Sequence, residues 1–349
     1  MTEHGVPSGA EGGSTDAAAS MILALGGNAI IRSREHGTLD EQYRNARLTL
    51  APVARMIGAG RRVVLTHGNG PIVGNILLRN EVARNLIPPM PLFVCGADSQ
   101  GGIGFMLQQV LGNELARIGA ARPVVAVVTQ VVVDANDPAF LDPTKPIGPF
   151  FSWSDAARIQ RAQQWVMRED SGRGYRRVVA SPEPLEIVET PAIRALIESG
   201  AVVIAAGGGG IPVTRAADGS LRGIDAVVDK DRAAALLGRT LGCRAFVILT
   251  EVPEVVLHYG EPDAAPIRHA SANEMRRWLA EGEFPAGSMG PKIESALHFI
   301  DGGGDEVLIT SPESLEAALA GSAGTRITSA GDPTRAEAAR GAARIGARS

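Results

Sequence analysis

The chain has 349 residues, of which 45 % are hydrophobic and 21 % charged, ordinary values for a globular protein with one large or two smaller domains. Its net charge of −4 gives no general attraction to nucleic acid or an anionic membrane, and no apolar run approaches the roughly 18 residues of a membrane span. Any anionic ligand must therefore be held by a local cluster of positive groups. The two cysteines, Cys95 and Cys243, cannot build a disulfide framework, and a cytoplasmic location fits them.

Short apolar runs alternate along the chain with longer helical patterns, which predicts an α/β fold with βα units around a largely parallel sheet. Residues 1–20 predict a disordered leader, and residues 329–349 predict a flexible tail. Most of the apolar runs lack polar alternation, as expected of strands buried on both faces. In chain order, the predicted strands are 21–25, 62–66, 124–133, 202–206, 246–250 and 306–310.

Helix starts are marked at three places. Thr190 and Ser311 each precede a proline, an arrangement typical of a cap followed by the first helical residue. Ser271 with Glu274 predicts a capping box. An exposed turn is predicted at 216–219, and we expect it to divide the chain into two parts that each carry a different ligand.

Glycine clusters follow three of the predicted strands directly. They are Gly26-Gly27-Asn28, Gly68-Asn69-Gly70 and the run 207–210. In open α/β sheets ligands bind at the carboxyl ends of strands, where glycine lets backbone N–H groups approach a phosphate closely. Glycine is also needed for tight turns, but three clusters at strand ends favour an anion-binding cleft. No Gly-Lys dipeptide and no complete GxGxxG pattern occur, which argues against a Walker P-loop and a nicotinamide dehydrogenase.

Residues 134–149 interrupt the alternation with four prolines, at 138, 143, 146 and 149. This number of prolines is too many for a helix or a central strand, so the segment predicts a long, stiff excursion from the sheet. Such a segment can be a decorative insertion or a lid. Lys145 in its middle favours a lid, which we expect to span about 134–180.

Lysine is rare in this chain: only Lys145, Lys230 and Lys292 occur beside 31 arginines. Lysine is a compact point charge, whereas arginine is a broad fork, so a lysine can address one oxygen in a narrow site. Phosphoryl transfer requires positive charge around the moving phosphoryl group, and three lysines suit that task. Asp231 is expected to cap a helix, to fix the lysines, or both. Lys292 is expected in the first turn of a helix.

For several other candidate residues, a purely structural role competes with a functional one. His67 lies in a glycine turn, where a lone histidine is more often structural than catalytic. Asp98, Ser99 and Gln100 are candidates for binding substrate or for capping the next helix. The arginines of 172–177 form an anion site, a solvated face or a dimer contact.

Taken together, these motifs closely resemble those of carbamate kinases in the amino acid kinase superfamily, from about residue 21 to 327. The lysine-bearing proline-rich segment separates carbamate kinases from the other branches. The matching motifs are ALGGNA (24–29), THGNGP (66–71), NDPAF (136–140), PTKPIGPF (143–150), GRGYRRVV (172–179), AAGGGGIP (205–212), DKD (229–231) and GSMGPK (287–292).

The resemblance implies an αβα sandwich around a mainly parallel sheet, with a protruding lid, in a homodimer. It implies reversible phosphoryl transfer between ATP and carbamate, giving ADP and carbamoyl phosphate, with Mg²⁺ accompanying the nucleotide and no metal ligand assigned on the protein. In such enzymes the reaction often serves to make ATP. The implied division is 21–218 for carbamate and the acyl phosphate, and 219–328 for the nucleotide.

The resemblance also implies roles for individual residues. Lys145 would reach in from the lid, Lys230 and Lys292 would contact nucleotide phosphates and the transition state, and Asp231 would organise the lysines. The acceptor and the transferred phosphoryl group would be held by Gly26, Gly27, Asn28, Gly68, Asn69 and Gly70. The nucleotide phosphates would lie near Gly207, Gly208 and Gly209.

Two departures from the family pattern keep alternatives open. Asp98 stands in an expected loop where an uncharged residue is usual, and Glu251 and Pro253 follow the strand at 246–250. The alternatives are a superfamily kinase for another small carboxylate or phosphate, and a nucleotide sensor without turnover.

Overall fold

The computed structural model describes residues 20–32, 35–170, 172–285 and 287–329. The predicted leader and tail therefore lie, apart from their innermost serines, outside the described residues. An eight-stranded sheet runs through the centre in the order β15-β17-β16-β12-β1-β2-β9-β3, with β15 and β17 opposite in direction to the other six. Its strands are β1 Ser20–Leu25, β2 Arg62–His67, β3 Val124–Ala126, β9 Val202–Ile204, β12 Ala245–Leu249, β15 His269–Ser271, β16 Glu306–Thr310 and β17 Thr325–Thr328.

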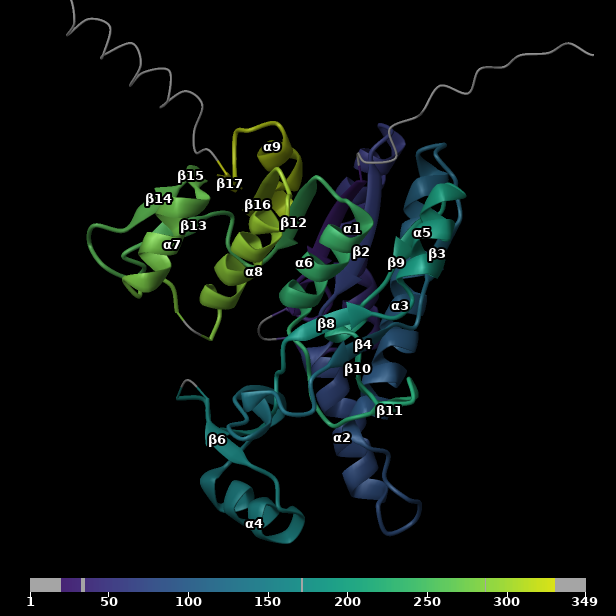
Figure 1. Ribbon diagram of the computed structural model, residues 1–349, viewed down its shortest axis with the longest axis vertical. Coiled ribbons are helices and arrows are strands. Elements are labelled where there is room, and N and C mark those ends of the chain that lie inside the picture. Colours follow the sequence, from purple (N-terminus) through teal and green to yellow (C-terminus); the bar gives the residue numbers. More distant parts are fainter. Residues whose placement is uncertain (1–19, 33–34, 171, 286, 330–349) are drawn as a thin grey trace, which may run out of the picture.

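Helices cover both faces of this sheet, which confirms the expected αβα sandwich (Figure 1). Strand β1 is apolar throughout because its alternating side chains enter two different cores. Ile22 and Ala24 belong to one core, and Met21, Leu23 and Leu25 belong to the other. The first core is closed by α5 Thr190–Glu198, α6 Lys230–Leu241, α7 Ala272–Ala280 and α8 Gly290–Asp301, and the second by α1 Leu39–Gly58, α3 Leu92–Arg117 and α9 Leu315–Leu319.

The predicted single strand 124–133 is wrong, because the chain divides there between two sheets. Its first part, β3, pairs with β9 at the edge of the central sheet, and its second part, β4, enters a separate four-stranded sheet. The backbone N–H of Thr129 donates to the side chain of Gln100, so the ladder stops between the two parts. The second sheet has the order β11-β10-β4-β8, with β4 Gln130–Val133, β8 Pro184–Ile187, β10 Ile211–Arg215 and β11 Leu221–Gly223.

The helix starts follow the expected signals to within one residue. Ser271 and Glu274 form the predicted capping box at α7, and Ser311 caps the 3₁₀ turn η4 Pro312–Ser314. Thr190 is wrong as a cap, because it is the first residue of α5 and Glu189 precedes it as the cap. The turn at 216–219 is exposed, as expected, and joins β10 to β11; its role as a division between two parts stays a prediction.

The proline-rich segment leads into a small unit, the lid, which lies apart from the central layers (Figure 1). Pro146 and Pro149 lie within its edge strand, where a missing N–H is tolerated. The arginines of 172–177, expected at an anion site, on a solvated face or in a dimer contact, lie against aromatic rings of the lid: Arg176 lies 5.1 Å from the Phe150 ring and Arg177 lies 4.2 Å from the Trp165 ring. The lid contains η2 Pro138–Phe140, β5 Lys145–Phe151, α4 Trp153–Gln163, β6 Met167–Glu169 and β7 Tyr175–Val179.

The remaining elements border the sheet at its carboxyl end. Helix α2, Gly70–Ala83, follows β2 and contacts β5 of the lid. The hairpin of β13 Val255–Leu257 and β14 Ala265–Ile267 follows β12. None of the described helices is both long enough and apolar enough to cross a lipid bilayer.

Candidate active site

The first two glycine clusters meet at the carboxyl ends of the neighbouring strands β1 and β2. The N–H of Gly68 donates to the carbonyl of Leu25 at 2.9 Å, which places the two turns side by side. A Cβ atom on Gly68 would lie 3.2 Å from the nitrogen of Gly27 and 3.3 Å from Cδ of Lys230. Glycine at this position therefore lets both turns and a lysine stem pack together. Asn28 belongs to the 3₁₀ turn η1, Gly27–Ala29, and its side chain is outside the described part of the structure.

Helix α6 starts at these turns and carries two aspartates with different tasks. Asp229 is the cap, because its Oδ1 accepts the backbone N–H of Asp231 at 2.8 Å. The expectation that Asp231 caps the helix is therefore wrong, while its other expected task, fixing the lysines, stays a prediction that its contacts fit. Asp231 is 2 % exposed and accepts from Nζ of both Lys230 and Lys292, the second at 3.4 Å. Lys292 lies in the first turn of α8, as expected.

Lys145 completes the cluster from the first residue of β5. Its Nζ lies 2.5 Å from Oδ2 of Asp229, so all three lysines of the chain meet two carboxylates at the start of α6. Burial raises the pKa of Asp229, but the nearby charges of Lys145 and Lys230 outweigh it and hold that pKa well below its usual value. Burial lowers the pKa of Lys230, and the charge of Asp231 opposes this effect.

The third glycine cluster, η3 Gly207–Gly209, lies behind the first two. A Cβ atom on Gly207 would meet the ring of His67 at 2.3 Å, and one on Gly208 would meet the amide of Asn69 at 2.1 Å. Glycine is required here because the turn packs directly beneath these two side chains. The predicted role of Gly207, Gly208 and Gly209 in nucleotide binding stays a prediction.

Three residues brace this region. Ser99 and Gln100 are candidates by sequence only for substrate binding or helix capping, and Thr129 has no signal in the sequence. Gln100 donates to the carbonyl of Gly207 at 2.9 Å, and Thr129 accepts the N–H of Ala206 at 2.9 Å. Ala206 has a left-handed backbone with φ of +51°, a strained state that these bonds maintain. Ser99 accepts from Asn69 at 2.8 Å. Only their partners, 30 to 107 residues away, give these side chains their roles.

The expectation that residues 98–100 cap a helix is wrong, because they lie inside α3. Asp98 is exposed on that helix and does not stand in a loop. His67 is buried, which lowers its pKa to about 4 and leaves its ring neutral. This state fits the structural role expected for a lone histidine.

Two adjoining cavities open beside the lysines. The first has a volume of about 350 Å³ and is lined by Gly26, Gly27, Lys230 and Lys292. The second, of about 230 Å³, shares Thr250, Glu251 and Lys292 with the first. Its walls are mainly apolar and aromatic, and they include Val252, Val256, Tyr259, Phe284 and Met289. The pair therefore offers a charged compartment next to an apolar one.

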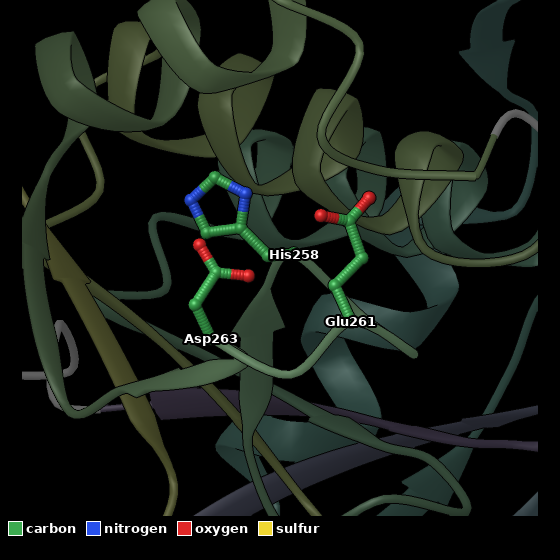
Figure 2. Close-up of side chains that lie close together, drawn as sticks. All are labelled: His258, Glu261 and Asp263. Atoms are coloured by element: carbon green, nitrogen blue, oxygen red, sulfur yellow. The ribbon is translucent and has the colours of Figure 1, made fainter.

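One group of potential metal ligands lies in the hairpin that follows β12. Within the described ranges, one group of three fits a metal ion, namely His258, Glu261 and Asp263 in the turn between β13 and β14. Figure 2 shows the carboxylate of Asp263 below the imidazole of His258 and that of Glu261 to its right, and all three residues are exposed. At the lysine cluster, by contrast, the carboxylate oxygens of Asp229 and Asp231 already accept from ammonium or backbone N–H groups.

Comparison with known proteins identifies the family. The sequence profile of the amino acid kinase family matches residues 20–311. The chain belongs to the amino acid kinase family. Among its relatives, the carbamate kinase-like protein YahI of Escherichia coli (strain K12) is 50 % identical over 310 residues, which cover 88 % of this chain and 98 % of the relative. The carbamate kinase of Pyrococcus horikoshii is 45 % identical with the same coverage of both chains.

Solved structures of amino acid kinases show the same fold. The carbamate kinase of Giardia lamblia bound to AMP-PNP superposes with a TM-score of 0.83 at 42 % identity, covering 89 % of this chain and 99 % of that chain. The same enzyme bound to citric acid gives a TM-score of 0.84 at 41 % identity and the same coverage. The resemblance predicted from the motifs is thereby confirmed.

Proposed function

We propose that the protein is a carbamate kinase, which transfers the γ-phosphoryl group of ATP to carbamate and yields ADP and carbamoyl phosphate. This proposal rests on one observation. Three lysines from three separate elements form ion pairs with two carboxylates, Asp229 and Asp231, beside the glycine turns. Three ammonium groups against two carboxylates leave a surplus of positive charge. Phosphoryl transfer needs such charge more than it needs covalent help from the protein.

The two cavities support a position for the nucleotide. We place its phosphates in the cavity lined by Gly27, Lys230 and Lys292, and its nucleoside in the adjoining apolar cavity. A purine ring stacks well on aromatic side chains, and Tyr259 and Phe284 supply them. The relative from Giardia lamblia binds the ATP analogue AMP-PNP, which agrees with an ATP site in this fold. We therefore propose that the nucleotide binds to the part 219–328 and to the Gly26-Gly27 turn.

The acceptor is placed on the other side of the lysines, at Gly68, Asn69 and Gly70. A carbamate oxygen attacks the γ-phosphorus and forms the new P–O bond, while the bond to the bridging β,γ-oxygen breaks and ADP leaves with that electron pair. Carbamate is already an anion, so it needs no general base, and the neutral His67 agrees with this. The lysines neutralise charge on the phosphoryl oxygens throughout.

Mg²⁺ is expected to arrive with the nucleotide. The oxygens of Asp229 and Asp231 are occupied by lysine and backbone donors, so the cluster does not fit a metal held by protein carboxylates. We therefore propose that nucleotide phosphates and water hold the ion, and we assign it no protein ligand.

The lid lysine provides a test of this mechanism. Replacing Lys145 with alanine removes one of three charges from the phosphoryl site, and we expect kcat to fall by about 10²–10³-fold, as for loss of one transition-state donor. The measurement is ATP formation from ADP and carbamoyl phosphate in a coupled assay. Arg168→Ala is the control, because Arg168 pairs with Asp142 on the exposed surface of the lid. Wild-type turnover in Lys145→Ala would remove the lid lysine from the mechanism.

A second acceptor class is tested in the same assay. The relative from Escherichia coli is named only as carbamate kinase-like, which keeps another small acyl phosphate open as the donor. Asp98, which first suggested this alternative, is exposed on α3. We expect ATP from carbamoyl phosphate and none from acetyl phosphate. Formation from acetyl phosphate alone would assign another acceptor, and binding of ATP without any turnover would indicate a nucleotide sensor.

We further propose that the reaction runs toward ATP in the cell, because carbamoyl phosphate is a reactive mixed anhydride. A cytoplasmic location suits this role and the two buried free thiols, Cys95 and Cys243.

A homodimer is proposed as well. An exposed apolar stripe on and after α2, formed by Leu78, Val82, Leu86, Ile87 and Met90, supports it.

A further inference from the structure

We propose that Asp229 is a positioning residue that holds the lid lysine, Lys145, over the phosphoryl site. This inference deepens the proposed phosphoryl transfer and rests on it. Asp231 already gathers Lys230 and Lys292 with its two oxygens. Asp229 does the corresponding work for the third lysine, so that the single tripeptide 229–231 sets the positions of all three.

The geometry supports this division of labour within one carboxylate. Oδ1 of Asp229 accepts the N–H of Asp231 at 2.8 Å and so is fixed by the start of α6. Oδ2 is directed to Nζ of Lys145 at 2.5 Å. The Asp229 side chain is 12 % exposed and the Lys145 side chain 33 % exposed, so the carboxylate is the better fixed of the two. A rigid helix cap therefore locates the end of a long side chain that arrives from a separate unit.

The lysine retains the capacity to bind phosphate in this pairing. An ammonium group has three donors, and Asp229 uses one of them. The others remain for phosphoryl oxygens, so Lys145 can bridge Asp229 and the substrate. Without Asp229 the side chain would have to be ordered by the substrate alone, and that entropic cost would fall on the transition state.

The segment before Asp229 makes a second contact with the lid. The N–H of Val227 donates to the carbonyl of Ala180 at 2.9 Å, and Val227 packs against a small apolar cluster that includes Ile147 and Val179. Both contacts lie at the same end of the antiparallel β5–β7 pair, where Lys145 is opposite Val179, so this end of the lid is joined twice to the chain leading into α6. Because Val227 makes the same connection without charge, loss of the ion pair should loosen Lys145 without detaching the lid.

Asp229→Asn separates the positioning role from the capping role. Asparagine caps helices about as well as aspartate, so α6 should persist, whereas the ionic partner of Lys145 is lost. We expect kcat to fall about 10–100-fold, with KM for ADP changed less than about twofold, as for misplacement of a catalytic group. Asp142→Asn, which removes the exposed ion pair with Arg168 on the same lid, should leave both constants unchanged.

A double-mutant cycle with Lys145→Met decides whether the effect acts through the lysine. If it does, Asp229→Asn should cost almost nothing further in the Lys145→Met background. Hydrogen–deuterium exchange of β5 gives a readout that needs no turnover, and we expect faster exchange in Asp229→Asn than in the wild type. If the losses of kcat in Asp229→Asn and Lys145→Met multiply in the double variant, the inference is overturned. Unchanged kcat and unchanged hydrogen exchange in Asp229→Asn would overturn it as well. A wild-type protein without transfer activity would overturn the proposed function instead, while the exchange result would still decide whether Asp229 holds the lid strand.

Discussion

Burial of Lys230 disfavours the protonated, charged form of its side chain. Burial lowers its pKa, Asp231 raises that pKa again, and the neighbouring charge of Lys292 lowers it further. Both oxygens of Asp231 face these lysines, and with the residue only 2 % exposed little water can replace the carboxylate. The charged state of the phosphate cavity therefore depends on one buried carboxylate.

Asp231→Asn should make activity more sensitive to alkaline pH. Without the carboxylate, the pKa of Lys230 moves further down, so the protonated form that transfer requires is lost at a lower pH than in the wild type. We expect the alkaline limb of the kcat–pH profile to shift toward neutrality and kcat at its plateau to fall at least about tenfold. Asp218→Asn, on an exposed turn, is the matched control. An unshifted alkaline limb would contradict the dependence of Lys230 on Asp231.

His67 should make the fold less stable in mild acid. Its pKa is about 4 in the folded protein, against 6.5 for an ordinary histidine, so the unfolded chain binds the proton first as the pH falls. The contribution of the neutral His67 ring to the free energy of unfolding is fully present above about pH 6.5 and is lost as the pH falls toward 4. The loss amounts to roughly 2 kcal/mol between pH 7.5 and pH 5. We expect His67→Gln to show a smaller fall in Tm between these pH values than the wild type. His269→Gln, at an exposed position, should retain the full fall, and equal falls in both variants would refute the argument.

At the scale of elements, the seating of the lid depends on a contact between two glycines. A Cβ atom on Gly74 of α2 would lie 2.2 Å from Cα of Gly148 in β5, so backbone meets backbone there. Gly148 has a φ of +75° and its carbonyl accepts from Arg176 at 3.0 Å, which fixes the lid side of the contact. Helix α2 thus sets how closely β5, and with it Lys145, approaches the site.

Gly74→Ala should displace the lid while leaving the body of the protein folded. Alanine favours a helix over glycine, but its Cβ forces β5 away and carries Lys145 from its position. We expect kcat/KM for carbamoyl phosphate to fall about 10–100-fold with little change in Tm, because small misplacements of catalytic groups are costly. Gly112→Ala on α3 meets nothing within 4 Å and is the control. Equal activity of the two variants would show that the lid is not seated by this contact.

The sequence predicts elements whose signals are local and fails where a distant side chain decides. The capping box at Ser271 and the glycine clusters at strand ends are local signals, and both are found as expected. The division of the strand at 124–133 depends on Gln100, 29 residues from Thr129, so no local pattern reveals it. Asp229 and Asp231 are equally good caps by sequence. Their tasks are distinguished by where α6 begins and by lysines that are far away in the sequence, with Lys145 84 residues from Asp229 and Lys292 61 residues from Asp231.

For the whole molecule, the site joins parts that are far apart along the chain. The lid comes from the middle of the chain, whereas α6, α8 and the apolar cavity come from the part after residue 229. Figure 1 shows the lid and α2 extending from the same end of the sandwich. Any partner that covers α2 would therefore also border the lid contact formed by Gly74.

We expect a second copy of the chain to cover α2. Val82 and Leu86 are 78 % and 86 % exposed, four residues apart, and a stripe of this kind can pack against its own copy about a two-fold axis. Sedimentation velocity at micromolar concentration should give about twice the 36.3 kDa mass of the chain. Val82→Glu with Leu86→Glu should give the monomer mass, because burying like charges at the two-fold axis is unfavourable. Leu141→Glu, 90 % exposed in the lid, should remain dimeric. A monomeric wild type, or a dimer that survives both substitutions on the stripe, would exclude this surface as the interface.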